Sequence, residues 1–404
     1  MSTPGVLHWV GCFLDLQDLL NLRRVSRITL TDITLIEMLN ISTNISVGAV
    51  LDSLSLFSHT RSLFIADGAS FAIDAVYKIA NNGIVYLELQ NFGKIPFGNG
   101  IHADLTGMTP NLFRLHHLHL KRALCDGVAL LEAIKWLGGL RTLYLQNTHQ
   151  LTDSDLRLII QRLLLLEVID IKKCMMLQFF EFPPSTGANL LQLSITECPS
   201  LSSVLMNSSC SRIERLCLDK TAIAQDTVEK ALLFLPTRIV ELRQCSNLLT
   251  ISVTNPTVQE IDLRACAFLR RLELSCPSLN RLDVLLCQQL NTLILSSSMI
   301  CHLDVTMLTS LRLLSLSCQR LQTLDVSGCI QLSFVRKSDK GIILRANEKF
   351  EARERQLVDH MELLHSIRSL LPLGSSGNLP MSWFASEYLG HIVKTHHHQR
   401  SSSL

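Results

Sequence analysis

The sequence has little charge and almost no charge imbalance. Asp, Glu, Lys and Arg make up only 18% of the 404 residues, and 37 basic against 35 acidic residues leave a formal net charge of +2. A charge this small excludes recognition of nucleic acid or anionic lipid through a bulk field, so we expect neither as a partner. Because 47% of the residues are hydrophobic, wholesale disorder is excluded as well.

Long uncharged apolar stretches are also missing. None approaches the roughly 18 residues that a membrane-spanning helix needs, and the apolar start from 6 to 14 has no basic residue before it. We therefore expect no membrane span and no signal peptide. The 13 cysteines are an odd number and follow a repeat, which favours reduced thiols in a cytoplasmic or nuclear protein over a disulfide framework.

The familiar motifs of catalysis are absent from the sequence. It contains no Gly-x-x-x-x-Gly-Lys-Ser/Thr, no Gly-x-Ser-x-Gly and no His-Glu-x-x-His. We expect no enzymatic activity, no catalytic residue and no cofactor.

What the sequence does contain is an internal repeat. The pattern Leu-x-x-Leu-x-Leu-x-x-Asn/Cys starts at Leu166, Leu190, Val258, Leu279 and Leu321, with weaker copies at Ile36, Thr60, Ile84, Leu115, Leu140, Ile213 and Ile300. This resembles leucine-rich repeats. Positions 1, 4 and 6 of each unit would point inward, and positions 3, 5 and 7 outward on a short strand. One unit cannot cover its own apolar face, so we expect stacked units that pair as a parallel sheet.

The spacing of the units changes along the chain. Units at 115, 140 and 166 are 25 and 26 residues apart, which leaves room for a return helix such as the one that Thr152 would cap. From 237 the starts at 237, 258, 279, 300 and 321 are 21 residues apart, and each gap holds a second apolar triplet. Ten or eleven residues cannot hold a helix and two turns, so we expect an α/β solenoid, helix-backed in its amino-terminal half and with strands on both faces in its carboxy-terminal half.

The cysteines of the shorter units fall into two columns. Cys245, Cys266, Cys287 and Cys329 lie on the 21-residue grid with Leu308 at the missing step, and Cys276 and Cys318 lie on a second grid with Ser297 between them. A zinc site would need four ligands that converge from different directions, whereas a column points its thiols the same way. We therefore expect buried thiols and no metal.

Outward positions should carry the function of a solenoid. Position 5 of the 21-residue units is acidic throughout, at Glu241, Asp262, Asp283, Asp304 and Asp325, and we expect an unbroken column of carboxylates one strand apart. Neighbouring arginines at 243, 264 and 281 would neutralise part of this charge. The column predicts a basic or hydrogen-bond-donating ligand, although Asp is also common at this position of such repeats.

The earlier units present aromatic residues and histidines on the same face. Tyr86, His117, His119 and Tyr144 suit a protein-binding surface. His117 and His119 share one side of a strand, but no third ligand is evident, so we expect exposed surface histidines. The complete target-binding face predicted here comprises Tyr86, His117, His119, Tyr144, Glu241, Arg243, Asp262, Arg264, Arg281, Asp283, His302, Asp304 and Asp325.

The repeat pattern stops after Phe334. Residues 347 to 371 become charged and have Phe350, Leu357, Leu364 and Leu371 seven apart, which predicts an amphipathic helix. Such a helix could form a coiled-coil seam, and capping of the open end of the solenoid is the favoured interpretation. The predicted organisation is a helical segment at 1–30, the solenoid at 31–336, and a helical cap with a flexible tail at 337–404.

The amino end has a pattern of its own. Phe13-Leu14, then Asp18-Leu19-Leu20, then Val25-Ser26-Arg27 resembles the core of an F-box, with Ser2-Thr3 where Leu-Pro is usual and Thr29 where Trp is usual. An F-box-like start followed by Cys-containing repeats is similar to the F-box and leucine-rich-repeat proteins, the substrate receptors of SCF cullin-RING ubiquitin ligases. The resemblance implies a Skp-type adaptor and a cullin as partners, with adaptor contact at Leu7, Phe13, Leu14, Leu19, Leu20, Leu22 and Val25.

Two interpretations follow. In the first, the chain brings a target protein to a ubiquitin ligase and contributes proximity only. In the second, it is a leucine-rich-repeat scaffold or inhibitor with no ligase link, and residues 1 to 28 seal the first repeat.

Overall fold

The computed structural model describes residues 16, 37–42, 46–67, 75–80, 82–91, 114–123, 130, 131, 134, 137–184, 186–337 and 343–345. The chain divides into two compact units, Met1–Asn347 and Glu348–Leu404, and all described residues belong to the first. The residues predicted to contact an adaptor and the predicted tail helix lie outside the described residues.

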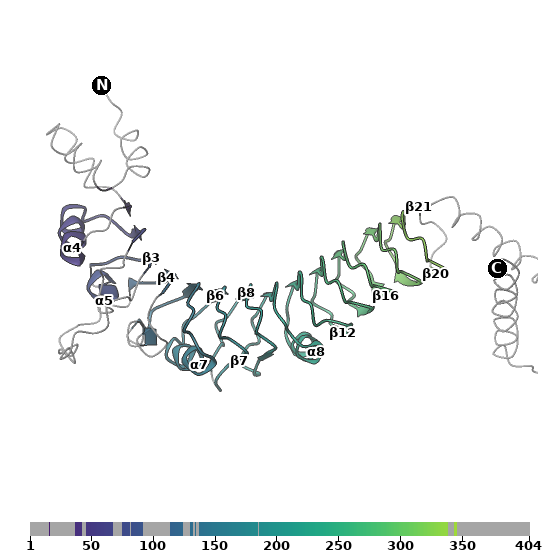
Figure 1. Ribbon diagram of the computed structural model, residues 1–404, viewed down its shortest axis with the longest axis horizontal. Coiled ribbons are helices and arrows are strands. Elements are labelled where there is room, and N and C mark those ends of the chain that lie inside the picture. Colours follow the sequence, from purple (N-terminus) through teal and green to yellow (C-terminus); the bar gives the residue numbers. More distant parts are fainter. Residues whose placement is uncertain are drawn as a thin grey trace, which may run out of the picture. The chain divides into compact units, whose positions relative to one another are not determined.

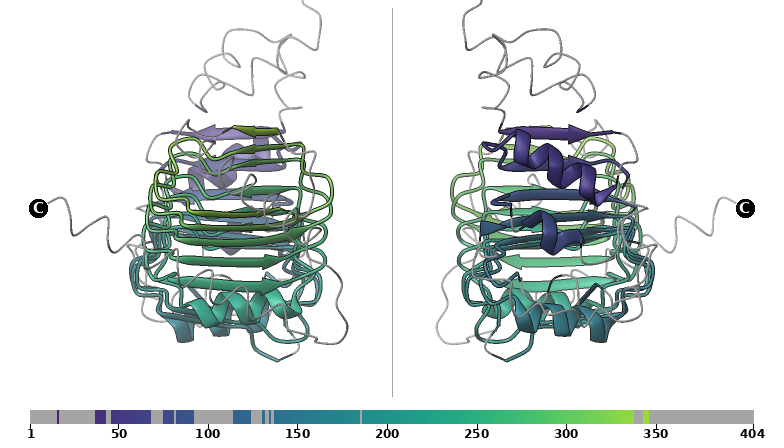
Figure 2. Two further views of the ribbon diagram at one scale, coloured as in Figure 1. Left: turned by 90° about the vertical axis from the view of Figure 1, so that its right-hand side faces the viewer. Right: turned by 90° about the vertical axis from the view of Figure 1, so that its left-hand side faces the viewer.

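One long parallel sheet runs through the first unit. Its eleven strands are hydrogen-bonded in chain order, and Figure 2 shows them stacked as rungs. They are β1 (Met38–Ile41), β2 (Ser62–Ile65), β3 (Tyr86–Gln90), β4 (His117–Lys121), β5 (Thr142–Gln146), β6 (Val168–Lys172), β8 (Gln192–Thr196), β10 (Arg215–Cys217), β11 (Ile239–Glu241), β13 (Glu260–Asp262) and β15 (Arg281–Asp283).

Every strand of this sheet begins at position 3 of a predicted unit. The weak copies at 36, 60 and 84 are confirmed by β1, β2 and β3, which begin at 38, 62 and 86. Positions 4 and 6 of each of these units are buried, as at Leu143 and Leu145 of β5. Positions 3, 5 and 7 are partly covered or exposed, except that Ser194 and Cys217 at position 5 and Asp219 at position 7 are buried. The core is therefore a stack of leucine, isoleucine and valine side chains shared by neighbouring units.

The opposite side of the stack changes from helices to strands (Figure 1). The longer units return through α4 (Val47–Leu56), α5 (Ala75–Ala80), α7 (Asp153–Arg162) and α8 (Gln225–Phe234), and one pair of short strands, β7 (Phe179–Glu181) and β9 (Ser203–Leu205). The 21-residue units return through a five-stranded parallel sheet of β12 (Thr250–Thr254), β14 (Arg271–Ser275), β16 (Thr292–Ser297), β18 (Leu313–Cys318) and β20 (Phe334–Lys337). The predicted change of architecture is confirmed.

The helix predicted after Thr152 is α7, and its start shows why it forms there. The Thr152 side chain accepts a hydrogen bond from the backbone N–H of Asp155, and the Asp155 carboxylate accepts one from the backbone N–H of Thr152. This capping box satisfies two of the N–H groups that a helix start leaves free. Leu156, Ile159 and Ile160 form its buried face.

A residue in the left-handed region ends each outward strand from β3 to β19. Position 8 has φ between 53° and 80° in all of these units, at Asn91, Arg122, Asn147, Lys173, Glu197, Lys220, Gln244, Ala265, Leu286, Met307 and Gly328. Side chains rarely adopt this backbone conformation, yet only the last of these residues is a glycine. At Gly328 a Cβ would lie 2.6 Å from the Met307 Sδ and 3.2 Å from the Met307 backbone, so close packing also favours glycine here.

The last units form a separate three-stranded sheet of β17 (His302–Asp304), β19 (Thr323–Asp325) and β21 (Ile343–Arg345). Both β20 and β21 contribute residues beyond 336, where the sequence pattern weakens. Short parallel strands repeated at a fixed interval around one leucine-rich core define a leucine-rich-repeat solenoid.

Candidate protein-binding face

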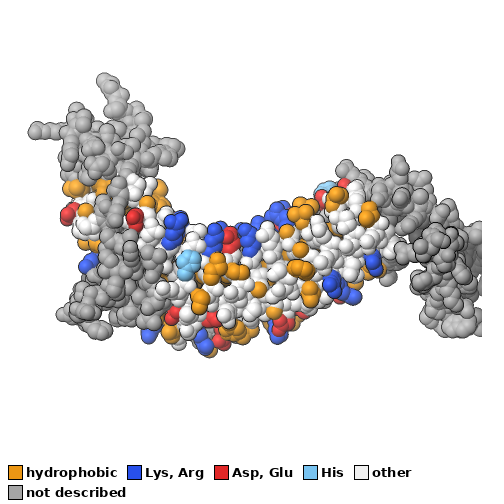
Figure 3. Space-filling model, in the orientation of Figure 1, with side chains coloured by type: hydrophobic (Ala, Val, Ile, Leu, Met, Phe, Trp, Pro, Cys, Tyr) orange, Lys and Arg blue, Asp and Glu red, His pale blue; other side chains and the backbone are white. Residues whose placement is uncertain are grey.

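The outward side of the long sheet brings together most of the residues predicted for target binding. Tyr86, His117, His119 and Tyr144 lie on β3 to β5, Glu241, Asp262, Arg281 and Asp283 lie on β11 to β15, and His302, Asp304 and Asp325 lie on β17 and β19. Arg243 and Arg264 lie just beyond β11 and β13. In Figure 3, basic and acidic side chains gather along the rim that carries these strands in Figure 1.

An aromatic cluster covers β2 to β5. We use this name for Phe64, Tyr86, His117, His119 and Tyr144. Ring centroids are 5.0 Å apart between Phe64 and Tyr86, 4.8 Å between Tyr86 and His119, and 5.0 Å between His119 and Tyr144. Phe64 was missed at the sequence level, although it occupies position 5 of its unit as His119 and Tyr144 do.

The two histidines of the cluster are half-buried, so the expectation of exposed histidines is wrong. The tyrosine rings on either side of His119 cover its imidazole, and burial lowers the pKa of both His117 and His119. Tyr86 donates its hydroxyl hydrogen to Glu88 at 3.2 Å and lies 3.1 Å from the Nδ1 of His119. Because the Tyr86 hydroxyl donates its one hydrogen to Glu88, its oxygen can only accept at His119. The neutral His119 tautomer with its proton on Nδ1 donates that hydrogen bond.

Glu88 holds the polar side of the cluster. Burial opposes its ionisation, but Lys121, whose Nζ donates to the Glu88 carboxylate at 2.6 Å, outweighs burial and lowers the pKa of Glu88. Burial, together with the neighbouring Glu88 charge, raises the pKa of Tyr86 above its usual range. At neutral pH the cluster thus presents two uncharged imidazoles and uncharged phenols beside the Glu88 carboxylate.

We predict that His119 makes the protein less stable in mild acid. Its pKa is lower in the folded than in the unfolded chain, so the unfolded chain binds more protons near the ordinary pKa of about 6.5, and stability falls as pH decreases through that value. Urea unfolding at pH 7.5 and pH 5 should show a smaller acid loss for His119→Gln than for the unchanged chain. An equal loss in the two proteins would contradict the assignment, and NMR titration of the imidazole gives an independent check.

A polar groove lies next to the aromatic cluster, over β6, β8, β10 and β11. It has a volume of about 470 Å³ and is hollow because small side chains, Ser194, Thr196 and Cys217, lie between longer charged ones. Burial raises the pKa of Asp170 at one end of the groove. Burial likewise raises the pKa of the Cys217 thiol to about 12. The groove residues that sequence reasoning missed are Asp170, Lys172, Gln192, Ser194, Thr196, Glu197, Arg215, Cys217, Asp219, Lys220 and Gln244.

Ion pairs fix the charged side chains around this groove. The ammonium groups of Lys172, Lys173 and Lys220 lie 3.4, 3.4 and 3.6 Å from the Glu197 carboxylate. Arg215 donates to Glu241 at 2.7 Å. Three lysines around one carboxylate leave a net positive site at this edge of the groove, beside the acidic residues that follow.

A charged strip continues from the groove across β10 to β15; we use this name for Asp219, Glu241, Arg243, Asp262, Arg264 and Asp283. Arg243 donates from its backbone N–H and its Nε to Asp219, both at 2.7 Å. Arg264 donates to Asp262 at 2.6 Å and lies 3.5 Å from Asp283. The predicted neutralisation by Arg243 and Arg264 is therefore present, and among the described residues Arg281 takes part in no ion pair.

The acidic column is not continuous, which corrects the expectation of an unbroken row. Glu241 pairs in register with Asp262, Asp262 with Asp283, and Asp304 with Asp325. Asp283 and Asp304 belong to different sheets, because β15 and β17 are not hydrogen-bonded to each other.

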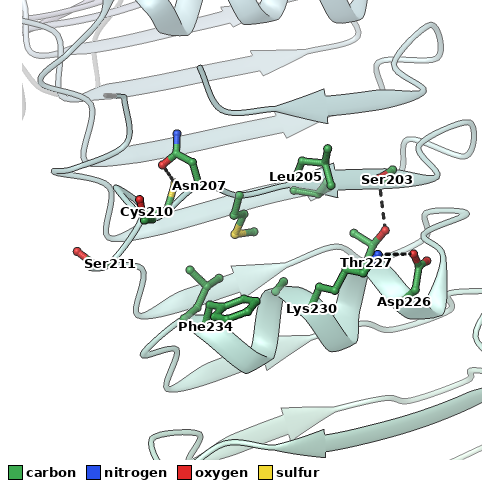
Figure 4. A pocket seen from close by; sticks show the side chains of 14 residues that line it. Ser203, Leu205, Asn207, Cys210, Ser211, Asp226, Thr227, Lys230 and Phe234 are labelled. Atoms are coloured by element: carbon green, nitrogen blue, oxygen red, sulfur yellow. Dashed lines mark hydrogen bonds and ion pairs between the residues drawn. The ribbon is translucent and has the colours of Figure 1, made fainter. Parts of the chain in front are cut away.

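A pocket of a different character lies on the opposite side of the stack, between β9 and α8. It has a volume of about 560 Å³ and an apolar wall that includes Leu205 and Phe234, the latter 79% exposed. Figure 4 shows Ser203 and Thr227, whose hydroxyls are 3.4 Å apart, at one end and Asn207 with Cys210 at the other. On this side of the pocket α8 packs against β9, whose one strand partner in the described segments is β7.

Among the described cysteines all are buried except Cys301, which is partly exposed. Cys245, Cys266, Cys287 and Cys329 are buried, and each donates its S–H to a backbone carbonyl of the preceding unit, at 3.0 to 3.1 Å. Burial raises the pKa of Cys245, Cys287 and Cys329 to about 11. Within the described ranges no group of three potential ligands is placed to hold a metal ion.

The helices of the described segments are short, at most ten residues, against about 20 for a membrane span.

Comparison with known proteins gives likenesses of structure only. No family model matches the sequence, and no curated protein matches it. The leucine-rich repeat domain of the type III effector XopL is 20% identical, with a TM-score of 0.33, and covers 69% of this chain and 81% of its own. A leucine-rich repeat protein of Leptospira interrogans is 14% identical, with a TM-score of 0.43, and the match covers 89% of this chain and 97% of that protein. A chain of the yeast Rad7 and Elc1 complex is 14% identical, with a TM-score of 0.35, and the match covers 87% of this chain and 90% of that one.

Proposed function

We propose that this chain recognises a target protein on the outward face of its long sheet and brings it to an SCF-type cullin-RING ubiquitin ligase. Residues 1–30 would bind a Skp-type adaptor, and the solenoid would hold the target. The supporting observation is the combination of the F-box-like pattern from Phe13 to Arg27 with a repeat face rich in aromatic and charged side chains.

The face is suited to protein recognition because its groups are already fixed before a partner arrives. The aromatic cluster is held by ring contacts, and the charged strip by ion pairs between neighbouring units. Side chains that are ordered in advance lose less conformational entropy on binding. Tyrosine and arginine, both present here, are the residue types that carry most of the energy in protein interfaces.

The buried thiols favour binding over thioester chemistry as the contribution of the described part of this chain. A nucleophilic cysteine needs a lowered pKa and access to solvent. Burial instead raises the pKa of Cys174 to about 12 and that of Cys198 to about 11. A receptor of this kind contributes proximity, while the transfer of ubiquitin takes place on other subunits.

The adaptor half of the proposal is tested by affinity capture from cells. The double variant Leu19→Asp and Leu20→Asp should lose at least ten-fold of the captured Skp-type adaptor and cullin, because charges in an apolar contact carry an uncompensated desolvation cost. The matched control is Leu164→Asp with Leu165→Asp, an adjacent leucine pair that is 56% and 48% exposed on the solenoid and should leave capture unchanged.

Absence of adaptor and cullin from the unchanged full-length chain would refute the ligase link. The repeat surface would then support the alternative, an interaction scaffold in which residues 1–28 seal the first repeat. Circular dichroism of both double variants shows whether the solenoid remains folded.

A further inference from the structure

One junction between neighbouring outward strands, the one between β15 and β17, lacks the hydrogen-bonded ladder that joins the outward strands on either side of it. At the preceding junction, Leu263 N–H donates to Asp283 O and Ala265 N–H to Leu285 O, both at 2.8 Å, and at the following junction Val305 and Met307 N–H donate to Asp325 and Ser327. The equivalent donors at the odd junction are Val284 and Leu286. Neither N–H has a hydrogen-bond partner in this fully described stretch.

The other side of the same units is intact. β14, β16 and β18 pair along their full lengths, from Arg271 with Thr292 to Ser297 with Cys318. The two units therefore lack ladder hydrogen bonds on one side only, although β15 and β17 remain neighbours. We call the gap between β15 and β17 the seam.

The seam coincides with the interruption of the first cysteine column. At neighbouring junctions the S–H of Cys287 donates to Leu263 O and the S–H of Cys329 donates to Val305 O. At the seam the same position is Leu308, which is buried, has no donor for Val284 O, and is larger than cysteine. Loss of the thiol bond and the extra bulk act in the same direction, since both disfavour close approach of the two turns.

The seam contains a cavity of about 430 Å³. Its walls include Leu282, Val284 and Val305, which are inward residues of the repeat, so the cavity reaches past the outward side chains to the backbone. Two strand edges with free N–H and C=O groups face each other across it. Such edges pair with an extended peptide in many complexes, in which backbone hydrogen bonds supply affinity.

Acidic and apolar side chains occupy different parts of the seam. Asp283 and Asp304 lie at position 5 on its two sides, and Asp304 has no ion-pair partner among the described residues. Beyond them lie Leu285, Leu286 and Met307, which are 46%, 56% and 66% exposed. An outward basic side chain of an inserted parallel strand would lie between the two carboxylates, and the outward residue two positions later would meet the apolar group.

We propose that the seam binds an extended segment of the target protein with the pattern Lys/Arg-x-large apolar, which enters as an added parallel strand. The units on either side turn about the intact pairs of β14, β16 and β18 as the segment enters. This inference rests on the proposed function for its target, and it concerns the solenoid alone, so it is separable from adaptor binding by residues 1–30.

The proposal is tested by selecting phage-displayed random twelve-residue peptides for binding to the full-length chain. Enriched peptides should share the pattern and should bind at least ten-fold more weakly to the double variant Asp283→Asn with Asp304→Asn. Asparagine keeps the oxygen that caps Leu285 N–H and Thr306 N–H, at 3.2 and 2.9 Å, so this variant retains the local fold. Glu273→Gln on β14, the same chemistry on the opposite sheet, should leave binding unchanged.

Leu308→Cys tests the cause. It restores the thiol donor for Val284 O, and it should close the seam, slow hydrogen exchange at Val284 and Leu286, and weaken peptide binding at least ten-fold. Failure to enrich any shared pattern, or equal binding to Leu308→Cys with slowed exchange, would overturn the proposal whatever the outcome of the adaptor experiment.

Discussion

Replacing Asn255 by alanine should destabilise the solenoid by about 4 kcal/mol, because several buried backbone groups would lose their partners at once. The Asn255 side chain donates to Leu232 O at 2.5 Å and to Leu235 O at 2.9 Å, and its Oδ1 accepts from Thr257 N–H and Val258 N–H at 2.8 and 3.1 Å. Asn255 is 2% exposed, so water cannot take over these bonds in the folded chain.

The position of Asn255 explains why the effect should be large. It lies directly after β12, where the return path changes from α8 to strands, and it ties the last carbonyls of α8 to the next unit. Urea unfolding followed by circular dichroism measures the loss. Asn255→Asp is the informative companion, since it keeps both acceptor contacts and removes the two donated bonds.

Cys276→Ala is the matched control for this prediction. Cys276 is the next residue on the same 21-residue grid and is equally buried, and we expect a loss of about 1 kcal/mol from its truncation. If Asn255→Ala cost no more than Cys276→Ala, the hydrogen bonds of Asn255 would be of no consequence for the junction between helix-backed and strand-backed units.

The solenoid could be predicted because its repeat consists of residues that must be buried. Each unit needs apolar side chains at positions 1, 4 and 6, so the starts of strands and the change from helix to strand follow from spacing alone. The second column of Cys276, Ser297 and Cys318 was found in the same way. Asn255 lies on the same grid. The column was recognised by its thiols and hydroxyl, so it did not indicate that an amide at this position would link the helix-backed and strand-backed units.

The binding face was less predictable, because outward residues are not constrained by the repeat. Asp219 and Arg215 lie in the weak copy that starts at Ile213, and nothing in their spacing indicates that Arg243 or Glu241 of the next unit will pair with them. The half-burial of His119 depends on Tyr86 and Tyr144, which lie in neighbouring units 33 and 25 residues away. Such contacts are decided by register between units.

The seam was less predictable than the solenoid and more predictable than the binding face. The sequence shows Leu308 as the one interruption of the first cysteine column, and this is the only local signal of the broken ladder. The pattern of positions 4 and 6 continues through β17 without change, so hydrophobic periodicity alone predicts an unbroken sheet and an unbroken acidic column.

Replacing Arg243 by alanine should destabilise the chain by about 2 kcal/mol. Removing one partner of a buried ion pair costs about 3–5 kcal/mol, and the Arg243 side chain is 36% exposed, which reduces the effect through solvent screening. Hydrogen bonds to Asp219, and then the charges of Glu241 and Asp262, raise the pKa of Arg243, so all three carboxylates stabilise its charged form.

The loss of stability in Arg243→Ala comes mainly from the carboxylates that are left without their partner. Without the Arg243 side chain, the Asp219 carboxylate, which is 8% exposed in the intact chain, keeps only the backbone N–H of residue 243 as a donor from that side. Urea unfolding of Arg243→Lys should show a partial loss, since lysine keeps the charge but lacks the planar fork that serves two acceptors. Combining Arg243→Ala with Asp219→Asn should recover part of the stability by removing the unpaired charge. Strict additivity of the two single changes would show that the pair does not couple adjacent units, and the ordering of the charged strip would then require another source.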